Sequence, residues 1–187
     1  CRNIVTIGAA LIITSAAAGA DAQGLPNQGQ GLVDGEFLKP PASSFVATSA
    51  WQYRFSTPPT GWQFSASGGS GWSRTNRIGF NGGGTVPGDV GPFANWPSGQ
   101  ATIWARTTFS VAAEDLDEVM LWGRWDDAID VFVNGVPAVE LGEWTPSNRY
   151  LGLSQAARAT LSATQPNVLA VRVVDFGGGR QLNLKPV

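Results

Sequence analysis

Residues 125–141 read Trp-Asp-Asp-Ala-Ile-Asp-Val-Phe-Val-Asn-Gly-Val-Pro-Ala-Val-Glu-Leu, and they predict a β-hairpin. The alternation from residue 128 onward places Ile129, Val131 and Val133 on one face of a strand. Asn134-Gly135 then supplies two residues that readily adopt the positive φ of a tight hairpin turn. Residues 136–141 return as the partner strand, so this part of the chain is β-structure.

The same two-residue period continues on both sides of the hairpin. In residues 103–111, Ile, Ala, Thr, Phe and Val alternate with Trp, Arg, Thr and Ser, which is typical of a half-buried strand. Further strands are predicted over 119–124, 167–175 and 180–184, weaker strands over 51–56 and 61–66, and one helix over 154–163 with Ser154 as its cap. Residues 68–99 are rich in glycine and cannot be regular strand throughout. Residues 50–187 are thus predicted to form an all-β domain, a two-sheet β-sandwich or jelly roll of about eight strands with one short helix.

The first 49 residues differ from the rest in composition. Residues 4–20 are apolar and alanine-rich, follow Arg2 and end at Ala20-Asp21-Ala22, which predicts a secretory signal peptide over residues 1–22. A retained membrane anchor and a lipidated Cys1 are the alternatives. Residues 23–49, rich in Gly, Gln, Pro and Ser, are predicted to be a flexible leader. We expect a bacterial protein that is secreted, periplasmic or at the cell surface, with no membrane contact after signal cleavage. Because the chain starts with Cys and not Met, we also expect an incomplete reading frame.

The composition excludes several kinds of chemistry. The 187 residues contain no histidine and one cysteine, so a Ser-His-Asp triad, a His-ligated zinc site and an intrachain disulfide cannot form. The net charge is −2 and no basic run is present, which argues against a nucleic-acid partner. The acidic residues of 114–118 lie in a polar turn, where solvated charges are the ordinary explanation. No catalytic constellation is evident, so an enzymatic role is not favoured, although it stays open for a fragment of a larger enzyme.

From about residue 51 to 184 the chain resembles the galactose-binding-like jelly-roll domain, a sugar-binding-type module of glycoside hydrolases and secreted bacterial proteins. The resemblance depends on segments that occur in the family's order: Trp51-Gln52-Tyr53, Gly71-Trp72, residues 103–111, residues 125–135 and residues 167–173. It implies a two-sheet sandwich, but because the fold hosts different functions it does not by itself name a ligand. The family often has Asp-Asp-Ser-x-Trp where this chain has Gly68-Gly69-Ser70-Gly71-Trp72, so any role of those acids in organising a loop or a calcium ion is in doubt here.

Tryptophan and arginine side chains are the first candidates for ligand contacts. A pyranose ring presents an apolar C–H face that suits a flat aromatic ring. The two-residue period puts Trp104 with Arg106, and Trp122 with Arg124, on one face of their strands. Trp96 and Trp144 lie in predicted loops. Packing in or around the core is the alternative for each of these indoles.

Acidic residues near the start of the hairpin are the second group of candidates. Asp126 and Asp127 precede the strand and Asp130 lies within it, with Glu140 and Glu143 in the partner half of the hairpin. Oxygen ligands of this kind suit a structural Ca²⁺ ion. Hydrogen bonds that tie the turn together are the alternative, and we prefer them. The predicted ligand-binding set is therefore Trp96, Trp104, Arg106, Trp122, Arg124, Asp126, Asp127 and Trp144, with no catalytic residue.

Three functions fit these observations. The first is a secreted, non-catalytic carbohydrate-binding-like module whose partner is a carbohydrate or cell-surface glycan. The second is an accessory domain of a truncated glycoside hydrolase, whose catalytic domain is missing from this chain. The third is a structural or adhesive surface protein whose aromatic face meets another protein.

Overall fold

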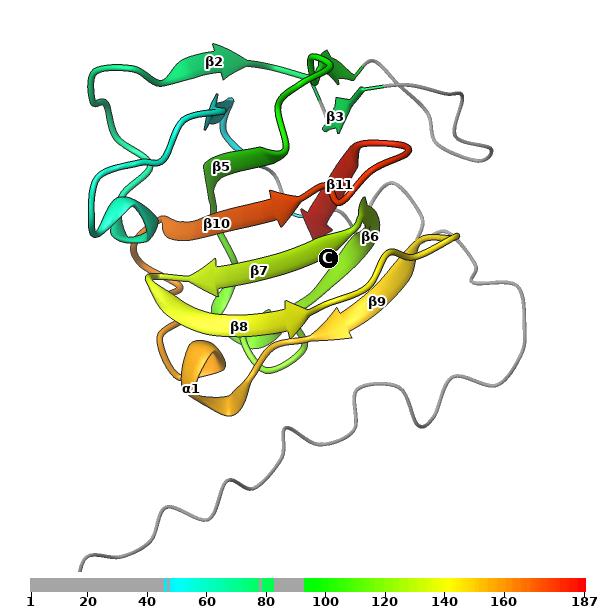
Figure 1. The fold of residues 1–187 in the computed structure, drawn as a ribbon. Helices are drawn as coiled ribbons and strands as arrows, with labels where there is room; N and C mark the ends of the chain where they lie inside the picture. The colour runs from blue at the N-terminus through cyan, green and yellow to red at the C-terminus, as the bar shows by residue number, and fades with distance from the viewer. Residues whose placement is uncertain (1–45, 47, 78, 83–92) are drawn as a thin grey trace, which may run out of the picture.

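The computed structural model describes residues 46, 48–77, 79–82 and 93–187, which form two facing β-sheets (Figure 1). The predicted signal peptide, residues 1–22, lies outside the described residues, as does most of the predicted leader, residues 23–49. The two-layer, nearly all-β architecture expected from the alternation pattern is confirmed.

The six-stranded sheet has the order β2-β1-β5-β10-β7-β8, with antiparallel neighbours. Its strands are β1 (Trp51–Arg54), β2 (Ser73–Thr75), β5 (Thr102–Phe109), β7 (Ala128–Val133), β8 (Val136–Leu141) and β10 (Asn167–Val174). The two eight-residue strands, β5 and β10, lie side by side at its centre. Their length follows from the regular alternation in these two segments, since every second side chain can be buried without interruption.

The five-stranded sheet has the order β4-β3-β11-β6-β9. Its strands are β3 (Phe80–Asn81), β4 (Ala94–Asn95), β6 (Met120–Asp126), β9 (Arg149–Gly152) and β11 (Gln181–Pro186). The β3–β4 pair is parallel and the other pairs are antiparallel. The helical segments are α1 (Gln155–Arg158) and the 3₁₀ turns η2 (Trp62–Phe64) and η3 (Ala113–Asp115).

The core fills the space between the two sheets. Ile103 and Phe109 of β5 are 0 % and 2 % exposed, and Trp125 of β6 is 1 % exposed. Phe80 of β3 meets the indole of Trp51 edge to face, with ring centroids 6.4 Å apart. Each such side chain stabilises the fold by roughly 1.5–3 kcal/mol through removal from water.

Two local predictions are confirmed by the backbone. Asn134 and Gly135 have φ of 50° and 84° and form the turn between β7 and β8. Ser154 caps α1, because its Oγ accepts a hydrogen bond from the backbone N–H of Ala157 at 3.1 Å. The helix is shorter than the predicted 154–163, since it ends at Arg158.

One local expectation was wrong. The predicted strand over 61–66 is instead the 3₁₀ turn η2, since Gly61 takes a φ of 81° and its carbonyl accepts from the N–H of Phe64 at 3.1 Å. The sandwich also has more strands than the eight expected, because β2, β3, β4 and β9 were not foreseen. These strands have two to four residues each, too few for alternation to be visible in the sequence.

Contacts of the domain reach back before residue 50, the predicted domain start. The backbone N–H of Val46 donates to the carbonyl of Pro186 at 3.1 Å, and that of Ser49 donates to the carbonyl of Thr108 at 2.8 Å. Thr48 forms an isolated bridge with Phe109. In the described part of the chain, no helix has both the length and the apolar character needed to span a bilayer.

Candidate functional site

The corner at Asp126 and Asp127 carries the chain from one sheet to the other. Asp126 is the last residue of β6 in the five-stranded sheet, and β7 of the six-stranded sheet begins at residue 128. The peptide bond between the two aspartates is cis. The backbone N–H of Asp127 donates to the carbonyl of Val174 at 2.9 Å, which fixes the corner beside the end of β10.

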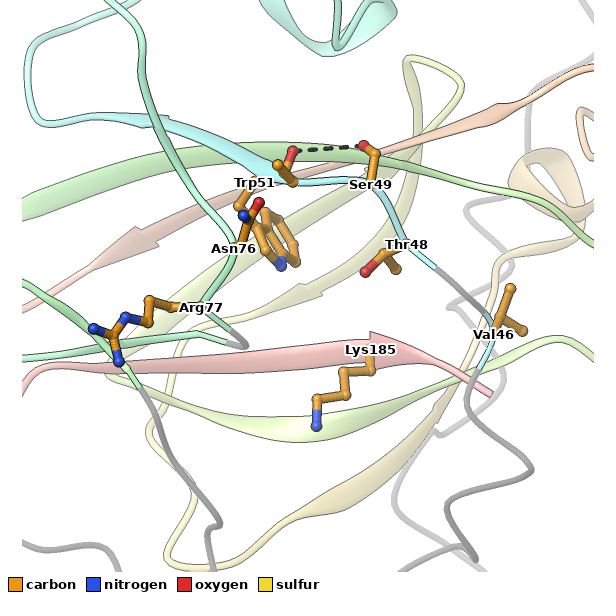
Figure 2. Close-up of a pocket in the computed structure, with 8 residues that line it drawn as sticks. Val46, Thr48, Ser49, Trp51, Asn76, Arg77 and Lys185 are labelled. Atoms are coloured by element: carbon orange, nitrogen blue, oxygen red, sulfur yellow. Dashed lines mark hydrogen bonds between the residues drawn. The ribbon is translucent and has the colours of Figure 1, made fainter.

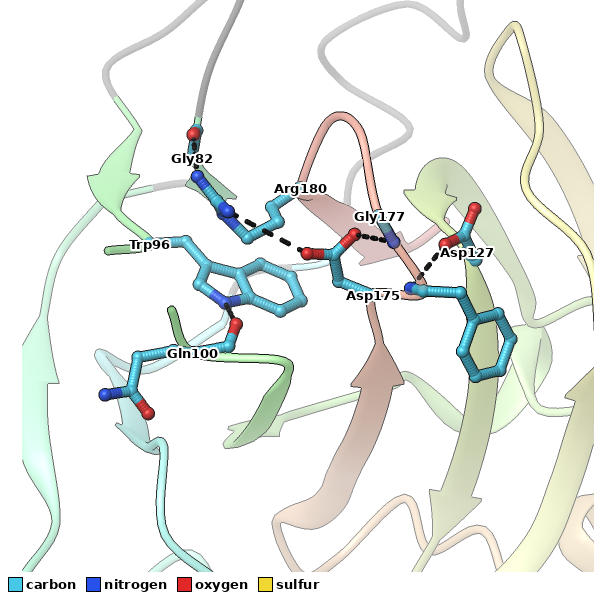
Figure 3. Close-up of polar contacts among 8 residues, drawn as sticks. Gly82, Trp96, Gln100, Asp127, Asp175, Gly177 and Arg180 are labelled. Carbon is cyan, nitrogen blue, oxygen red and sulfur yellow. Dashed lines mark hydrogen bonds and ion pairs between the residues drawn. The ribbon is translucent and has the colours of Figure 1, made fainter. Parts of the chain in front are cut away.

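Two loops that carry exposed aromatic rings are tied to this corner. In the β10–β11 loop, the N–H of Phe176 donates to Oδ2 of Asp127 at 2.6 Å (Figure 3). In the β8–β9 loop, the carbonyl of Glu143 accepts from Nε1 of Trp125 at 2.9 Å. The side chains of Phe176 and Trp144 are 73 % and 55 % exposed. We call this region, defined by Asp126, Asp127, Trp144 and Phe176, the loop-end site.

Charged groups hold the β10–β11 loop in place beside the corner. Asp175 accepts from the N–H of Gly177 at 2.9 Å through Oδ1, while its Oδ2 lies 3.8 Å from Nη1 of Arg180 (Figure 3). Arg180 also donates to the carbonyl of Gly82 at 2.5 Å. The exposed ring of Phe176 therefore extends from a loop that hydrogen bonds and an ion pair anchor on both sides.

Asp126 is the residue of this site with a perturbed proton affinity. Burial, a hydrogen bond with Asp127 and repulsion from Asp127 and Asp175 raise the pKa of Asp126 to about 6, while Arg124 acts in the opposite direction. Asp126 is thus protonated over part of the range between pH 4 and pH 6 in which a free aspartate is charged. The protonated carboxyl can donate a hydrogen bond to its neighbour, which a carboxylate cannot do.

Because the pKa of Asp126 is raised on folding, its ionisation destabilises the folded state as the pH rises from about 4 to above 6. Asp126→Asn is expected to remove this loss, since an amide can also donate to Asp127. After allowance for solvent screening, we expect the variant to gain about 1 kcal/mol at pH 7.5 and little at pH 4. Urea unfolding at both pH values measures the difference. Asp117→Asn, in an exposed turn, is the control. An equal gain for Asp126→Asn at both pH values would contradict the assignment.

The structure brings four of the eight predicted residues together at this end of the sandwich. Asp126 and Asp127 form the corner, Trp144 lies on the adjoining loop, and Arg124 precedes the corner on β6 and donates to the carbonyl of Pro146 at 3.3 Å. Phe176, Asp175 and Arg180 were not predicted as site residues. The sequence signal near them is the glycine run Gly177-Gly178-Gly179 before the last strand, which indicates a connecting turn and not a site.

Trp96 and Trp122 were predicted as ligand contacts, but both side chains are buried. Trp96 is 0 % exposed and its Nε1 donates to the carbonyl of Gln100 at 2.7 Å (Figure 3). Trp122 is 2 % exposed and lies in register between Lys185 and Tyr150 in the five-stranded sheet. Sequence position in a loop or on the second face of a strand did not reveal this burial.

Trp104 and Arg106 share the outer face of the six-stranded sheet, as the period predicted, but they lie in different surroundings. Trp104 is partly buried and in register with Arg54 and Arg172. Arg106 is only 5 % exposed and donates to the side chain of Gln52 and to the carbonyls of Trp62 and Gly68. Its guanidinium carbon lies 3.9 Å from the ring centroid of Trp72. Arg106 is therefore covered by residues 62–72 and is not exposed for ligand contact.

The acidic residues considered for calcium do not converge. Asp130 forms an ion pair with Arg172 at 2.5 Å, so its side chain is held on the outer face of the six-stranded sheet. Within the described ranges, no three Asp, Glu, His or Cys side chains come close enough together to hold a metal ion. Asp127 instead stabilises the turn at Phe176, which agrees with the hydrogen-bonding alternative for that residue.

No family model and no curated protein matches the chain. Similar folds occur among solved glycoside hydrolases of family 2. A family 2 member from Bacteroides cellulosilyticus aligns with a TM-score of 0.50 and 17 % identity, over 76 % of this chain and 20 % of that one. A Bacteroides uniformis β-glucuronidase aligns with a TM-score of 0.49 and 14 % identity, over 75 % and 17 %. The likeness to the Bacteroides cellulosilyticus protein shows a shared fold. This chain spans a fifth or less of the length of these two enzymes.

Proposed function

We propose that this chain is a non-catalytic carbohydrate-binding module of the galactose-binding-like type, and that it contacts sugar at the loop-end site. The observation that carries the proposal is the pair of exposed rings, Trp144 and Phe176. The loop of Phe176 is hydrogen-bonded to Asp127, and the loop of Trp144 is hydrogen-bonded to Trp125, which precedes Asp126. Aromatic rings exposed on two loops at the same end of a domain can serve as contact points for a partner.

The chemistry of the loop-end site suits a polyhydroxylated, uncharged ligand. An indole or phenyl ring can cover the C–H face of a pyranose. The carboxyl groups of Asp126 and Asp127 lie at the corner to which the β10–β11 loop is hydrogen-bonded, and they can accept hydrogen bonds from sugar hydroxyls. With Asp175 nearby, three carboxyl groups would repel an acidic sugar at neutral pH. We therefore expect neutral glycans to bind here in preference to uronic acids.

Trp144→Ala is expected to weaken glycan binding about tenfold or more, because truncating an aromatic anchor usually costs above 1 kcal/mol. A glycan array with the full chain would identify the ligand, and affinity electrophoresis or calorimetry would measure the change. Phe176→Ala should have an effect of similar direction.

Phe64 provides a matched control, because its side chain is 61 % exposed on η2, outside the loop-end site. Phe64→Ala should leave binding unchanged. Equal losses for Phe64→Ala and Trp144→Ala, or a flat array for the unsubstituted chain, would contradict the proposal.

An accessory role within a larger glycoside hydrolase is the second candidate function. It is supported by the fold shared with the Bacteroides cellulosilyticus family 2 protein, of which this chain matches 20 %. In this case the domain would hold substrate for a catalytic domain elsewhere. Genomic sequence downstream of residue 187 tests the idea: a stop codon there would contradict it, and an open frame into a catalytic domain would support it.

A further inference from the structure

A hollow lies between the start of β1 and the last strand, β11. It has a volume of about 420 Å³ and is lined by Val46, Thr48, Ser49, Ala50, Trp51, Asn76, Arg77 and Lys185 (Figure 2). A second hollow of about 330 Å³ adjoins it, sharing Ala50 and Asn76 and adding Arg74 and Thr75. None of these residues belongs to the loop-end site.

The lining of the two hollows is basic. Arg74, Arg77 and Lys185 contribute three positive charges, and no Asp or Glu is among the lining residues. This contrasts with the loop-end site, where Asp126 and Asp127 are adjacent and the charge of Asp175 is near enough to raise the pKa of Asp126. A concave surface with charges of one sign raises the local concentration of ligands of the other sign.

Neutral donors complete the surface of the larger hollow. Trp51 is 4 % exposed, and Figure 2 shows its indole nitrogen turned toward the side on which Lys185 lies. Asn76 adds a side-chain amide and Thr48 a hydroxyl to the lining of this hollow (Figure 2). Indole N–H, amide N–H₂ and hydroxyl groups all donate hydrogen bonds to oxyanions, and Val46 and Ala50 supply apolar contact.

From this arrangement we infer that the hollow binds a small ligand that carries an oxyanion, a carboxylate or a sulfate. Arg77 and Lys185 attract and pair with the anionic group, while Trp51, Asn76 and Thr48 donate to its oxygens or to neighbouring hydroxyls. A volume of about 420 Å³ is within the range of small-molecule sites and has room for one acidic monosaccharide. The site is independent of the loop-end site and of the glycan bound there.

Calorimetry with the full chain tests the inference, using sodium glucuronate, glucose and sodium sulfate as probes at low salt. Glucuronate should bind and glucose should not. Sulfate binding as well would show that the oxyanion alone suffices, whereas its absence would show that the sugar hydroxyls contribute. Binding should weaken as sodium chloride is raised, because screening reduces the attraction. No heat with either anion, or equal binding of glucose, would overturn the inference.

Substitutions then locate the site. Arg77→Gln and Lys185→Gln should each weaken glucuronate binding about tenfold or more, because each removes a charge-assisted hydrogen bond. Arg172→Gln, on the outer face of the six-stranded sheet, removes the same charge elsewhere and should not change the affinity. Trp144→Ala should also leave glucuronate binding intact, which separates this site from the loop-end site. Thermal unfolding confirms that each variant is folded. Anion binding that survives both Arg77→Gln and Lys185→Gln would contradict the assignment.

Discussion

Arg106→Ala is expected to lower the free energy of unfolding by about 3 kcal/mol, and to loosen residues 61–72 even where the domain stays folded. The guanidinium donates to Gln52 Oε1 at 3.0 and 3.3 Å, to the carbonyl of Trp62 at 3.1 Å and to the carbonyl of Gly68 at 2.5 Å. Burial lowers the pKa of Arg106, and the positive charge of Arg54 lowers it further. The acceptors of the guanidinium are all neutral oxygens, one side-chain amide and two backbone carbonyls. Alanine would leave those acceptors without their donor.

The aromatic contacts over Arg106 would be lost with the guanidinium. Trp72 lies against it at 3.9 Å and stacks on Trp62 with a centroid distance of 6.2 Å. Trp62 in turn meets Phe132 of β7 edge to face. We therefore expect faster proteolysis within residues 61–72 of the variant, since this segment depends on the face that Arg106 holds together.

Urea unfolding measures the loss, and limited proteolysis with mapped cleavage sites measures the loosening. Arg172→Ala is the matched control, because Arg172 lies on the same outer face but is exposed and makes a surface ion pair. Its loss should cost less than about 1 kcal/mol. Similar losses for the two variants would mean that burial of Arg106 contributes nothing beyond a surface charge.

Gly123→Ala is expected to cost about 3 kcal/mol or more, enough to prevent folding of a marginally stable domain. Gly123 is buried in β6 and pairs with Leu184 of β11. A Cβ at this position would overlap the carbonyl of Asn183 and lie 2.8 Å from Cα of Leu184. A side chain could relieve such an overlap by changing its rotamer, but backbone atoms cannot. Strands β6 and β11 would therefore have to move apart.

Gly142→Ala is the control for this substitution. A Cβ added at Gly142 meets no atom within 4 Å, and its φ is not in the left-handed region. Its effect should stay within about 0.5 kcal/mol. Thermal unfolding and expression in soluble form distinguish the two variants. A stable Gly123→Ala domain would show that β6 and β11 tolerate a wider separation than their register suggests.

The long strands could be predicted because alternation continues in them for six or more residues. Strands β5, β7 and β10 each bury every second side chain, and the Asn134-Gly135 turn is encoded by two adjacent residues. The short strands β3 and β4 form by pairing with segments far away in the chain. No local sequence pattern therefore predicts them.

The environment of single side chains was harder to predict than the strands. The period placed Arg106 on the outer face correctly, yet its cover comes from Trp62 and Trp72, more than thirty residues earlier. Phe176 was not predicted, because the glycines that follow it indicate a connecting loop and carry no signal of a site. Its importance depends on the hydrogen bond to Asp127, which is 49 residues away in sequence.

The position of β11 has a consequence for how the chain folds during synthesis. This strand, residues 181–186, is the last in sequence but lies between β3 and β6 in the middle of its sheet. Until it emerges from the ribosome, β3 and β6 lack the neighbour that joins them, and their inner faces stay incompletely covered. Folding of this layer must therefore wait until residues 181–186 have been synthesised, and it is expected to be slow because segments far apart in the sequence have to meet.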